Sequence, residues 1–404
     1  MVRIRINDPA LIALALAASF LGLVFIFDAG YARSLASGRG MIPGEFKTQL
    51  MMFVVSIVAG GLMSKLPGDK WQKASKLIWF LAFVSVFLPE IPGLAHRQNG
   101  ADRWFKLPFL PPIQPAEFVK VAVIIYLAGL FAKRKAWEPK PAKDWAQWLD
   151  RNLGRKLKRC LPALWIVIAC VVIEKEPDMG TAAVIAATAF ALFVVGGVSK
   201  KTLIAGSVAG VLLVGWLVTH ESYRMERIRN HGARWSAENM DDAGWQTVQS
   251  EIGLAAGGLI GVGPGAGRAK HVLPAATTDF VSATIGEEFG LLGMWGVLAV
   301  LGGLVFRLFH LAKRAADPFA ALYLSGFGAW IAVQTSVNVM MANGLLPAIG
   351  IPMPFVSSGG SSLIALWMGI GIANSVLVRR PVREEAVETD RDRWGHGRAR
   401  LSGA

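Results

Sequence analysis

The strongest constraint on this fold is a run of 61 residues, 318–378, that contains no Asp, Glu, Lys or Arg. A helix of about 20 apolar residues crosses a bilayer, so the run is long enough for two crossings and a connection. Its middle, residues 343–361, is rich in Pro, Gly and Ser, which are typical of non-helical backbone. We therefore predict two transmembrane helices joined by a non-helical segment.

Eight shorter apolar stretches without charged residues precede this run, and 53% of the chain is hydrophobic while only 17% is charged. The stretches are residues 10–27, 48–64, 77–89, 121–132, 161–173, 179–199, 202–218 and 289–306. Three of them are short enough to suit a buried helix of a soluble protein, but interfacial residues can extend them. The sequence thus predicts an all-α polytopic membrane protein in which residues 1–380 form about ten transmembrane helices. We expect residues 381–404 to be a charged, disordered cytoplasmic tail.

The chain is basic, with 42 Lys and Arg against 28 Asp and Glu and a formal net charge of +14. Such an excess alone could indicate nucleic-acid binding. With the N-terminus in the cytoplasm, however, ten crossings place 28 of the basic residues in cytoplasmic segments and 13 in outside loops. This asymmetry follows the positive-inside rule. We therefore expect both termini in the cytoplasm and no nucleic-acid partner.

The longest predicted outside segment, residues 220–280 between spans 7 and 8, concentrates charged residues. It also contains four alternating glycines followed by two cations: Gly261, Gly263, Gly265, Gly267, Arg268 and Lys270. Successive backbone N–H groups and two cations could bind a phosphate. A flexible loop at the membrane surface is the alternative interpretation.

Asp279 directly precedes a predicted span, within the sequence LPAATTDF. One interpretation is an N-cap, because Asp accepts a hydrogen bond from the first helical turn and suits the positive end of the helix dipole. The other is a general base at the membrane surface, provided that an acceptor hydroxyl comes within hydrogen-bond reach. From the residues alone, capping is the more frequent role.

Three further polar groups lie beside or inside predicted spans, and they contain Arg103, the pair Glu117 and Lys120, and Asp178. Glu117 and Lys120 are three residues apart, so they share a helical face and can form an ion pair. The pair could be structural, or it could line a path for an anionic head group. Asp178 has the same two interpretations, because it could also cap a helix that begins before Thr181.

Two more features complete the candidate site. Glu287 and Glu288 follow Asp279 on the next predicted helix, and one of them could bind a divalent cation such as Mg²⁺ or Mn²⁺. The loop around Ser357 and Ser358 has a non-helical composition between two spans, and such backbone at membrane depth must be satisfied by protein or water. A re-entrant segment lining a cavity fits this loop, and a simple exposed turn is the alternative.

Taken in order, seven short motifs resemble the SEDS family of polytopic membrane proteins, the FtsW, RodA and SpoVE group. They are GADRW, QPAEFVK, EPDMGT, WQTVQS, GVGPG, LPAATTDFVSATIGEEFG and PFVSSGGSS. The resemblance extends from the first span to about Arg380. It implies a peptidoglycan glycosyltransferase that polymerises lipid II, with a class B penicillin-binding protein and other division or elongation proteins as partners. The catalytic carboxylate proposed for the family, the Asp of the TDF motif, is Asp279 here, which reverses the preference for a cap.

The resemblance also implies an inverting reaction at the outer face of the cytoplasmic membrane. Cations would then stabilise the pyrophosphate leaving group, and the candidates are Arg103, Lys120, Arg268 and Lys270; Glu117, Asp178, Ser357 and Ser358 are the other substrate-binding candidates. A flippase for lipid-linked precursors and a noncatalytic division scaffold are the rival functions, and a polymerase of cell elongation, like RodA, is the alternative to a division role.

The sequence departs from the family pattern at three positions. Ala275 and Thr277 replace a common Glu and His, and Ser358 replaces a common Tyr. The short Gly-rich connector, residues 261–272, resembles the FtsW division branch more closely than RodA.

Overall fold

The computed structural model describes residues 8–377 except for 39, 99, 100, 107–110, 134–143, 221, 241 and 243. The predicted tail, 381–404, lies outside the described residues. The elements are α1 (Pro9–Ala36), α2 (Gly44–Lys65), α3 (Gly68–Ser85), η1 (Leu88–Glu90), β1 (Ala95–Gln98), β2 (Ala101–Phe105), α4 (Pro115–Phe131), α5 (Trp145–Lys175), α6 (Met179–Val195), α7 (Lys200–His220), α8 (Ser222–Gly232), α9 (Trp245–Gly257), α10 (Ala269–Val272), α11 (Val281–Arg314), α12 (Pro318–Ala342) and α13 (Gly360–Val376).

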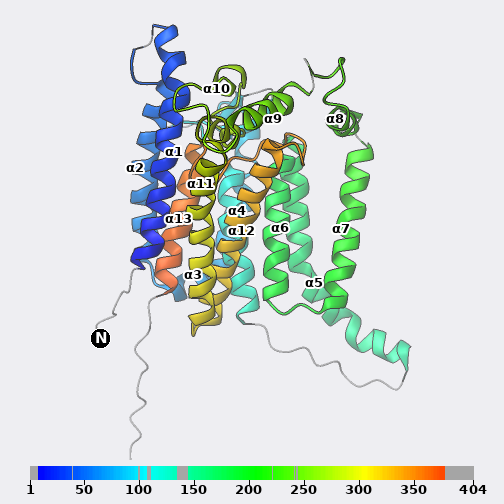
Figure 1. The fold of residues 1–404 in the computed structure, drawn as a ribbon. Coiled ribbons are helices and arrows are strands. Elements are labelled where there is room, and N and C mark those ends of the chain that lie inside the picture. Colours follow the sequence, from blue (N-terminus) through cyan, green and yellow to red (C-terminus); the bar gives the residue numbers. More distant parts are fainter. Residues whose placement is uncertain are drawn as a thin grey trace, which may run out of the picture.

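Nine long helices, α1–α6 and α11–α13, form a bundle in the described part of the chain, and a tenth, α7, stands beside it with its described side chains largely exposed (Figure 1). By length and composition alone, α1, α2, α3, α11 and α12 contain segments apolar enough to cross a membrane, and α6 and α13 are shorter apolar helices. The first residue of α1 and the last of α13 lie at the same end of the bundle (Figure 1). The predicted polytopic all-α fold is confirmed, with a small β-hairpin as an addition.

The three short apolar stretches belong to longer helices. α3 begins at Gly68, α4 at Pro115 and α5 at Trp145, so each helix includes charged residues before its apolar part. In α4, a proline at the first helical position and Glu117 in the first turn favour a helix start, because proline needs no N–H partner there and the carboxylate suits the dipole. Lys120 therefore lies inside a helix rather than at its edge.

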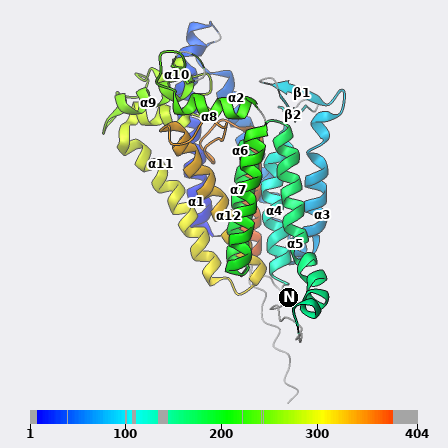
Figure 2. The same cartoon turned by 90° about the vertical axis from the view of Figure 1, so that its right-hand side faces the viewer.

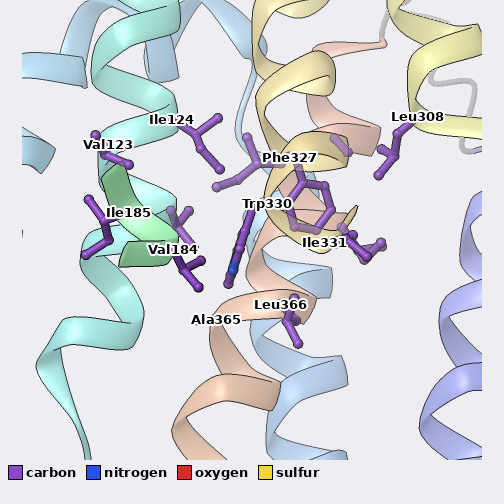
Figure 3. Close-up of a cluster of buried hydrophobic side chains, with 14 of the residues drawn as sticks. Val123, Ile124, Val184, Ile185, Leu308, Phe327, Trp330, Ile331, Ala365 and Leu366 are labelled. Atoms are coloured by element: carbon purple, nitrogen blue, oxygen red, sulfur yellow. The ribbon is translucent and has the colours of Figure 1, made fainter. Parts of the chain in front are cut away.

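The centre of the bundle is α12, which packs against α4, α6, α11 and α13. Its Trp330, Tyr323 and Phe319 are fully buried. Figure 3 shows the apolar contacts of this region, with Val123 and Ile124 from α4, Val184 and Ile185 from α6, Leu308 from α11, Phe327, Trp330 and Ile331 from α12, and Ala365 and Leu366 from α13. This core lies beneath the loops that carry the candidate site.

The predicted division of the long uncharged run is confirmed, because α12 ends at Ala342 and α13 begins at Gly360. The connection, residues 343–359, is not an exposed turn. Met353, Phe355 and Val356 are at most 2% exposed, so the segment is packed into the protein. Because water does not reach this buried non-helical backbone, protein groups must satisfy its hydrogen bonds.

The remaining short elements lie at the other end of the bundle from the start of α1 (Figures 1 and 2). β1 and β2 pair antiparallel, with His96 opposite Trp104, and carry the GADRW motif into a hairpin that the sequence pattern did not predict. The long segment between α7 and α11 contains α8, α9 and α10, so it is an ordered set of helices rather than a flexible loop.

The topology gives a labelling prediction. In a Cys160→Ser/Cys170→Ser background, Ala237→Cys between α8 and α9 should react with a membrane-impermeant thiol reagent on intact spheroplasts. Ala146→Cys at the start of α5 should react only after lysis, because the basic segments are expected to face the cytoplasm. Both alanines are exposed, so the two introduced cysteines should be equally accessible to a reagent on their own side of the membrane. Labelling in the reverse order would contradict the orientation.

Candidate active site

Asp279 ends the segment that connects α10 to α11. α11 begins at Val281 with Phe280 at the N-cap position, and no side chain caps it. The capping interpretation of Asp279 is therefore wrong. Within the described part of the chain, no group donates a hydrogen bond to its carboxylate. The carboxylate is thus available to an incoming hydroxyl.

The backbone beside Asp279 is held by the loop between α12 and α13. The Ser358 N–H donates to the carbonyl oxygen of Thr277 at 2.8 Å. The Ser357 hydroxyl donates to the carbonyl oxygen of Thr278 at 2.5 Å and accepts from a backbone N–H of its own loop. Ser357 and Ser358, predicted as substrate-binding residues, thus lie next to Asp279, where they fix its main chain.

Asn338 of α12 completes this attachment. Its Nδ2 donates to the carbonyl oxygens of Asp279 at 2.8 Å and Ile351 at 2.7 Å, and its Oδ1 accepts from the Ser282 hydroxyl at 2.7 Å. The Asn338 side chain is fully buried. One amide therefore joins the Asp279 segment, the re-entrant loop and the start of α11.

Arg103 is the cation whose positive charge lowers the pKa of the Asp279 carboxyl. Its Nε donates to the carbonyl oxygen of Glu176 at 2.6 Å and its Nη2 to that of Pro177 at 2.5 Å. These bonds hold the β2 strand to the loop between α5 and α6. The hydrogen-bond partners at this anchor are neutral carbonyls, and the positive charge of Arg103 acts on the nearby carboxyl groups of Glu176, Asp178 and Asp279.

The surroundings of Asp279 raise the pKa of its carboxyl to about 6. The main cause is burial, which disfavours the charged form, and the negative charge of Asp178 adds to it. Arg103 acts in the opposite direction. A pKa near 6 suits a general base at neutral pH, because the group is mostly ionised and still basic enough to take a proton.

Asp178 has the capping role that its sequence allowed. Its Oδ1 accepts from the Thr181 N–H at 3.0 Å at the start of α6, and its Oδ2 accepts from Gln114 Nε2 at 2.6 Å. Burial raises the pKa of this carboxyl as well. The backbone N–H of Gln114 in turn donates to Ser361 Oγ at 3.0 Å, so α4, α6 and α13 meet at this point.

The predicted ion pair between Glu117 and Lys120 is present, with Lys120 Nζ at 2.8 Å from Glu117 Oε1. Both residues are at most 3% exposed. Lys120 also donates to Gln334 Oε1 at 3.2 Å, and Gln334 Nε2 donates to the carbonyl oxygen of Pro352 at 2.8 Å. Glu117 Oε2 is buried without a hydrogen-bond partner in the described structure. The pair is thus connected to the re-entrant loop through Gln334, and Glu117 Oε2 is the acceptor that it leaves unused.

The Gly-rich segment binds carboxylates of the protein itself. The N–H groups of Gly265 and Gly267 donate to Glu288 at 3.3 and 3.1 Å, and that of Ala269 donates to Glu287 Oε2 at 2.7 Å. The segment is an anion-binding turn, as its composition predicted, but the anions are internal. The prediction that this turn binds a substrate phosphate is therefore wrong.

Lys270 also requires a correction. Its Nζ lies 2.8 Å from Asp28 Oδ2 of α1 and 2.6 Å from Glu288 Oε1 of α11, and its side chain is 1% exposed. Because two carboxylates bind this ammonium and the side chain is buried, a pyrophosphate cannot contact it. The neighbouring Arg268 is exposed, so of the four predicted cations it and Arg103 are not enclosed by carboxylates of the protein as Lys120 and Lys270 are.

The same contacts bear on the predicted metal ligands. Glu287 and Glu288 are buried and already accept hydrogen bonds from backbone N–H groups, which does not fit metal coordination. The residues that the structure describes contain no group of three or more His, Cys, Asp and Glu side chains able to hold a metal ion. We derive no step through a divalent cation.

Two of the departures from the family pattern have clear structural roles. The Thr277 hydroxyl donates to Glu45 Oε2 of α2 at 3.0 Å, so it ties the Asp279 segment to a second helix. Ala275 packs beside a small buried apolar cluster that contains Leu273 and Phe280.

Sequence reasoning missed the uncharged amides of the site, namely Gln49, Gln114, Gln334 and Asn338. Gln49 Oε1 accepts from the Gly359 N–H at 3.1 Å, so it supports the far end of the same loop. A usable signal was present, because Gln49, Gln334 and Asn338 lie within uncharged predicted spans, where a buried amide is costly unless it is hydrogen-bonded.

The Asn338 contacts give a stability prediction. Asn338→Ala removes the partners of two backbone carbonyls and one hydroxyl, each of which costs about 1–3 kcal/mol if left unsatisfied. We expect a clearly lower Tm in detergent than for the native chain, measured by thermal unfolding. Ser336→Ala, an exposed position on the same helix, is the control and should leave the Tm unchanged. Equal Tm values for the two variants would contradict the role of Asn338.

Comparison with known proteins gives full-length similarity to one family. The model of the FtsW, RodA and SpoVE group, described as a cell cycle protein, matches residues 9–381. The probable peptidoglycan glycosyltransferase FtsW of Trichlorobacter lovleyi is 29% identical over 92% of this chain and 93% of its own length. That of Bacillus subtilis is 31% identical over 88% and 86%.

Solved structures agree with this relationship. A chain from a peptidoglycan synthase complex, studied for how it coordinates polymerization and crosslinking, is 26% identical with a TM-score of 0.73, over 96% of this chain and 99% of that one. The rod shape determining protein RodA of Thermus thermophilus is 25% identical with a TM-score of 0.63, over 92% and 96%. This multi-pass membrane protein belongs to the FtsW, RodA and SpoVE family.

Proposed function

We propose that this chain is a peptidoglycan glycosyltransferase that polymerises lipid II at the outer face of the cytoplasmic membrane. The observation that carries the proposal is that, in the described structure, Asp279 has a held main chain and a carboxylate without a hydrogen-bond donor. Asn338 binds its carbonyl oxygen and Ser357 and Ser358 bind those of the two preceding residues, while its carboxylate has no donor among the described residues. A half-buried, positioned and unpaired carboxylate is the arrangement that general base catalysis needs.

In the proposed step, Asp279 accepts the proton of the 4-hydroxyl of a lipid-linked GlcNAc. That oxygen attacks the anomeric carbon of the terminal MurNAc of the growing glycan, and the new C–O bond forms as the bond to the pyrophosphate breaks. Undecaprenyl pyrophosphate leaves with the bonding electron pair, and the anomeric configuration inverts. The proton then passes from Asp279 to water.

The leaving group gains negative charge, so fixed cations should stabilise it. Arg103 suits this role because backbone carbonyls hold its guanidinium without neutralising it. Arg268, which is exposed, is a second candidate. Lys120 acts indirectly, since its contacts support the loop around Pro352.

We further propose a role in cell division, with a class B penicillin-binding protein as the partner. The support is the name FtsW among its relatives and the similarity to a chain from a synthase complex that coordinates polymerization and crosslinking. In this arrangement both termini face the cytoplasm and Asp279 faces outward. A flippase for lipid-linked precursors is the rival function, because the bundle contains buried charges.

Asp279→Asn tests the mechanism. The amide cannot take the proton, and losing a general base typically lowers the rate by about 10²–10⁴-fold. We expect this loss in lipid II polymerisation by purified protein in detergent, with the class B partner present. Polymerisation in detergent also separates the rivals, since a flippase or a scaffold makes no glycan where no second leaflet exists.

Stability is the control for this variant. Burial of an ionised carboxylate is unfavourable, so above pH 6 the neutral amide of the Asp279→Asn variant should leave the Tm equal or higher. Asp242→Asn, at an exposed position of the outer segment, should leave both polymerisation and Tm unchanged. A folded Asp279→Asn protein with near-native polymerisation would eliminate the mechanism.

The raised pKa gives a pH dependence. Because the base is the ionised form, kcat/KM for lipid II should rise with pH through about 6 and level off above it. Asp178→Asn should move this rise to lower pH, because Asp178 contributes to the raised pKa of Asp279. Asn also caps helices well, so α6 should be retained. A profile that does not respond to Asp178→Asn would contradict the electrostatic coupling.

A further inference from the structure

The outer segment contains an uncharged apolar part with exposed side chains at its turn. Residues 252–267 include no Asp, Glu, Lys, Arg or His. At the turn after α9, Leu259 is 67% and Ile260 is 78% exposed. Contiguous exposed apolar surface of this kind marks an interaction site.

Backbone hydrogen bonds fix this turn against α11. The Leu291 N–H donates to the carbonyl oxygen of Gly258 at 2.9 Å, and that of Leu292 donates to Leu259 at 3.1 Å. The approach occurs at a break in α11, where Gly290 has φ 66° and a Cβ atom would lie 2.4 Å from the backbone nitrogen of Gly261. The turn therefore lies level with Leu291 and Leu292, whose side chains are also exposed.

Two ion pairs lie along α1, one at Asp8 just before its first residue and one at Asp28, eight residues before its last. Asp8 pairs with Arg307 at 2.6 Å, and Asp28 pairs with Lys270 at 2.8 Å. The residues between Asp8 and Asp28 carry no charge. Twenty helical residues rise about 30 Å, which is the thickness of the hydrocarbon core of a bilayer. We take the levels of these two ion pairs as the inner and outer boundaries of that core.

The same helix rise, counted from the Asp8–Arg307 pair, places the turn closer to the bilayer centre than Asp28. Leu292 is fifteen helical residues from Arg307, a rise of about 22 Å, and the tilt of α11 in Figure 2 reduces its height further. An independent contact agrees, because the ring of Phe289 packs against that of Phe25 at 5.4 Å, three residues inward of Asp28. The turn is therefore several ångströms below the level of Asp28.

We propose that residues 258–262 are embedded among the phospholipid acyl chains of the outer leaflet. Lipid is the occupant that the structure favours, because the turn continues the exposed face that α11 presents with Leu292 and Trp295 as a candidate membrane span. Leu259 and Ile260 bury apolar surface in the bilayer, and the chain then returns to the level of Asp28 at Gly265. The segment that leads to Asp279 is thereby anchored at a fixed depth. This inference does not depend on the proposed function.

Depth-dependent quenching tests the proposal. Ile260→Cys, in the Cys160→Ser/Cys170→Ser background, is labelled with an NBD fluorophore and reconstituted into vesicles of phosphatidylethanolamine and phosphatidylglycerol. We expect doxyl-labelled lipid to quench the fluorophore, more strongly with the spin label in the upper part of the chain than near its methyl end. Iodide in the external buffer should have little effect. Leu259→Cys provides a second site if Ile260→Cys folds poorly.

Two matched positions calibrate the result. Trp295→Cys, on the exposed face of α11, should be quenched by lipid, and Ala237→Cys, between α8 and α9, should be quenched by iodide. Quenching of the Ile260→Cys label by iodide would overturn the proposal, because the turn would then be in water. Protection from both quenchers would overturn it as well, since protein, from a second copy of the chain, would then cover the turn.

Discussion

The structure depends on one constraint, which is that backbone at membrane depth must find its hydrogen bonds within the protein. The loop between α12 and α13 and the segment before α11 are both non-helical. Buried side-chain amides solve this problem, since Asn338 and Gln334 of α12 bind carbonyls of the loop and Gln49 of α2 binds its last N–H group. Because these amides come from helices, they attach the irregular segments, and with them the main chain of Asp279, to the bundle.

The elements of the fold were predictable because their signals are local. Runs without charge define the spans, Pro and Gly divide the longest run, and a spacing of three residues predicts the Glu117–Lys120 pair. Helix ends were less predictable, since α3, α4 and α5 continue through charged residues that hydropathy excludes. The identity of the candidate base came from the family resemblance, because the residues alone favoured a cap.

The tertiary contacts of the site could not be predicted, because they join residues far apart in the sequence. Lys270 is separated from Asp28 by 242 positions, and composition alone gave no sign that the two would pair. Once paired, Lys270 is lost as an anion-binding group. The Gly-rich turn was predicted correctly as an anion-binding structure, but the nearby carboxylates of Glu287 and Glu288 occupy it. The number of Lys and Arg residues in a sequence therefore overestimates the number of cations that a substrate can contact.

The way in which Arg103 is held has a consequence for how the family can vary. Its guanidinium binds the main-chain oxygens at positions 176 and 177 rather than a carboxylate. Any residue supplies a carbonyl, so this contact does not itself require the side chain of Glu176. A carboxylate anchor would have tied the two side chains together, and a change in one would have required a change in the other. The main-chain anchor thus holds the cation without depending on which side chain stands at position 176.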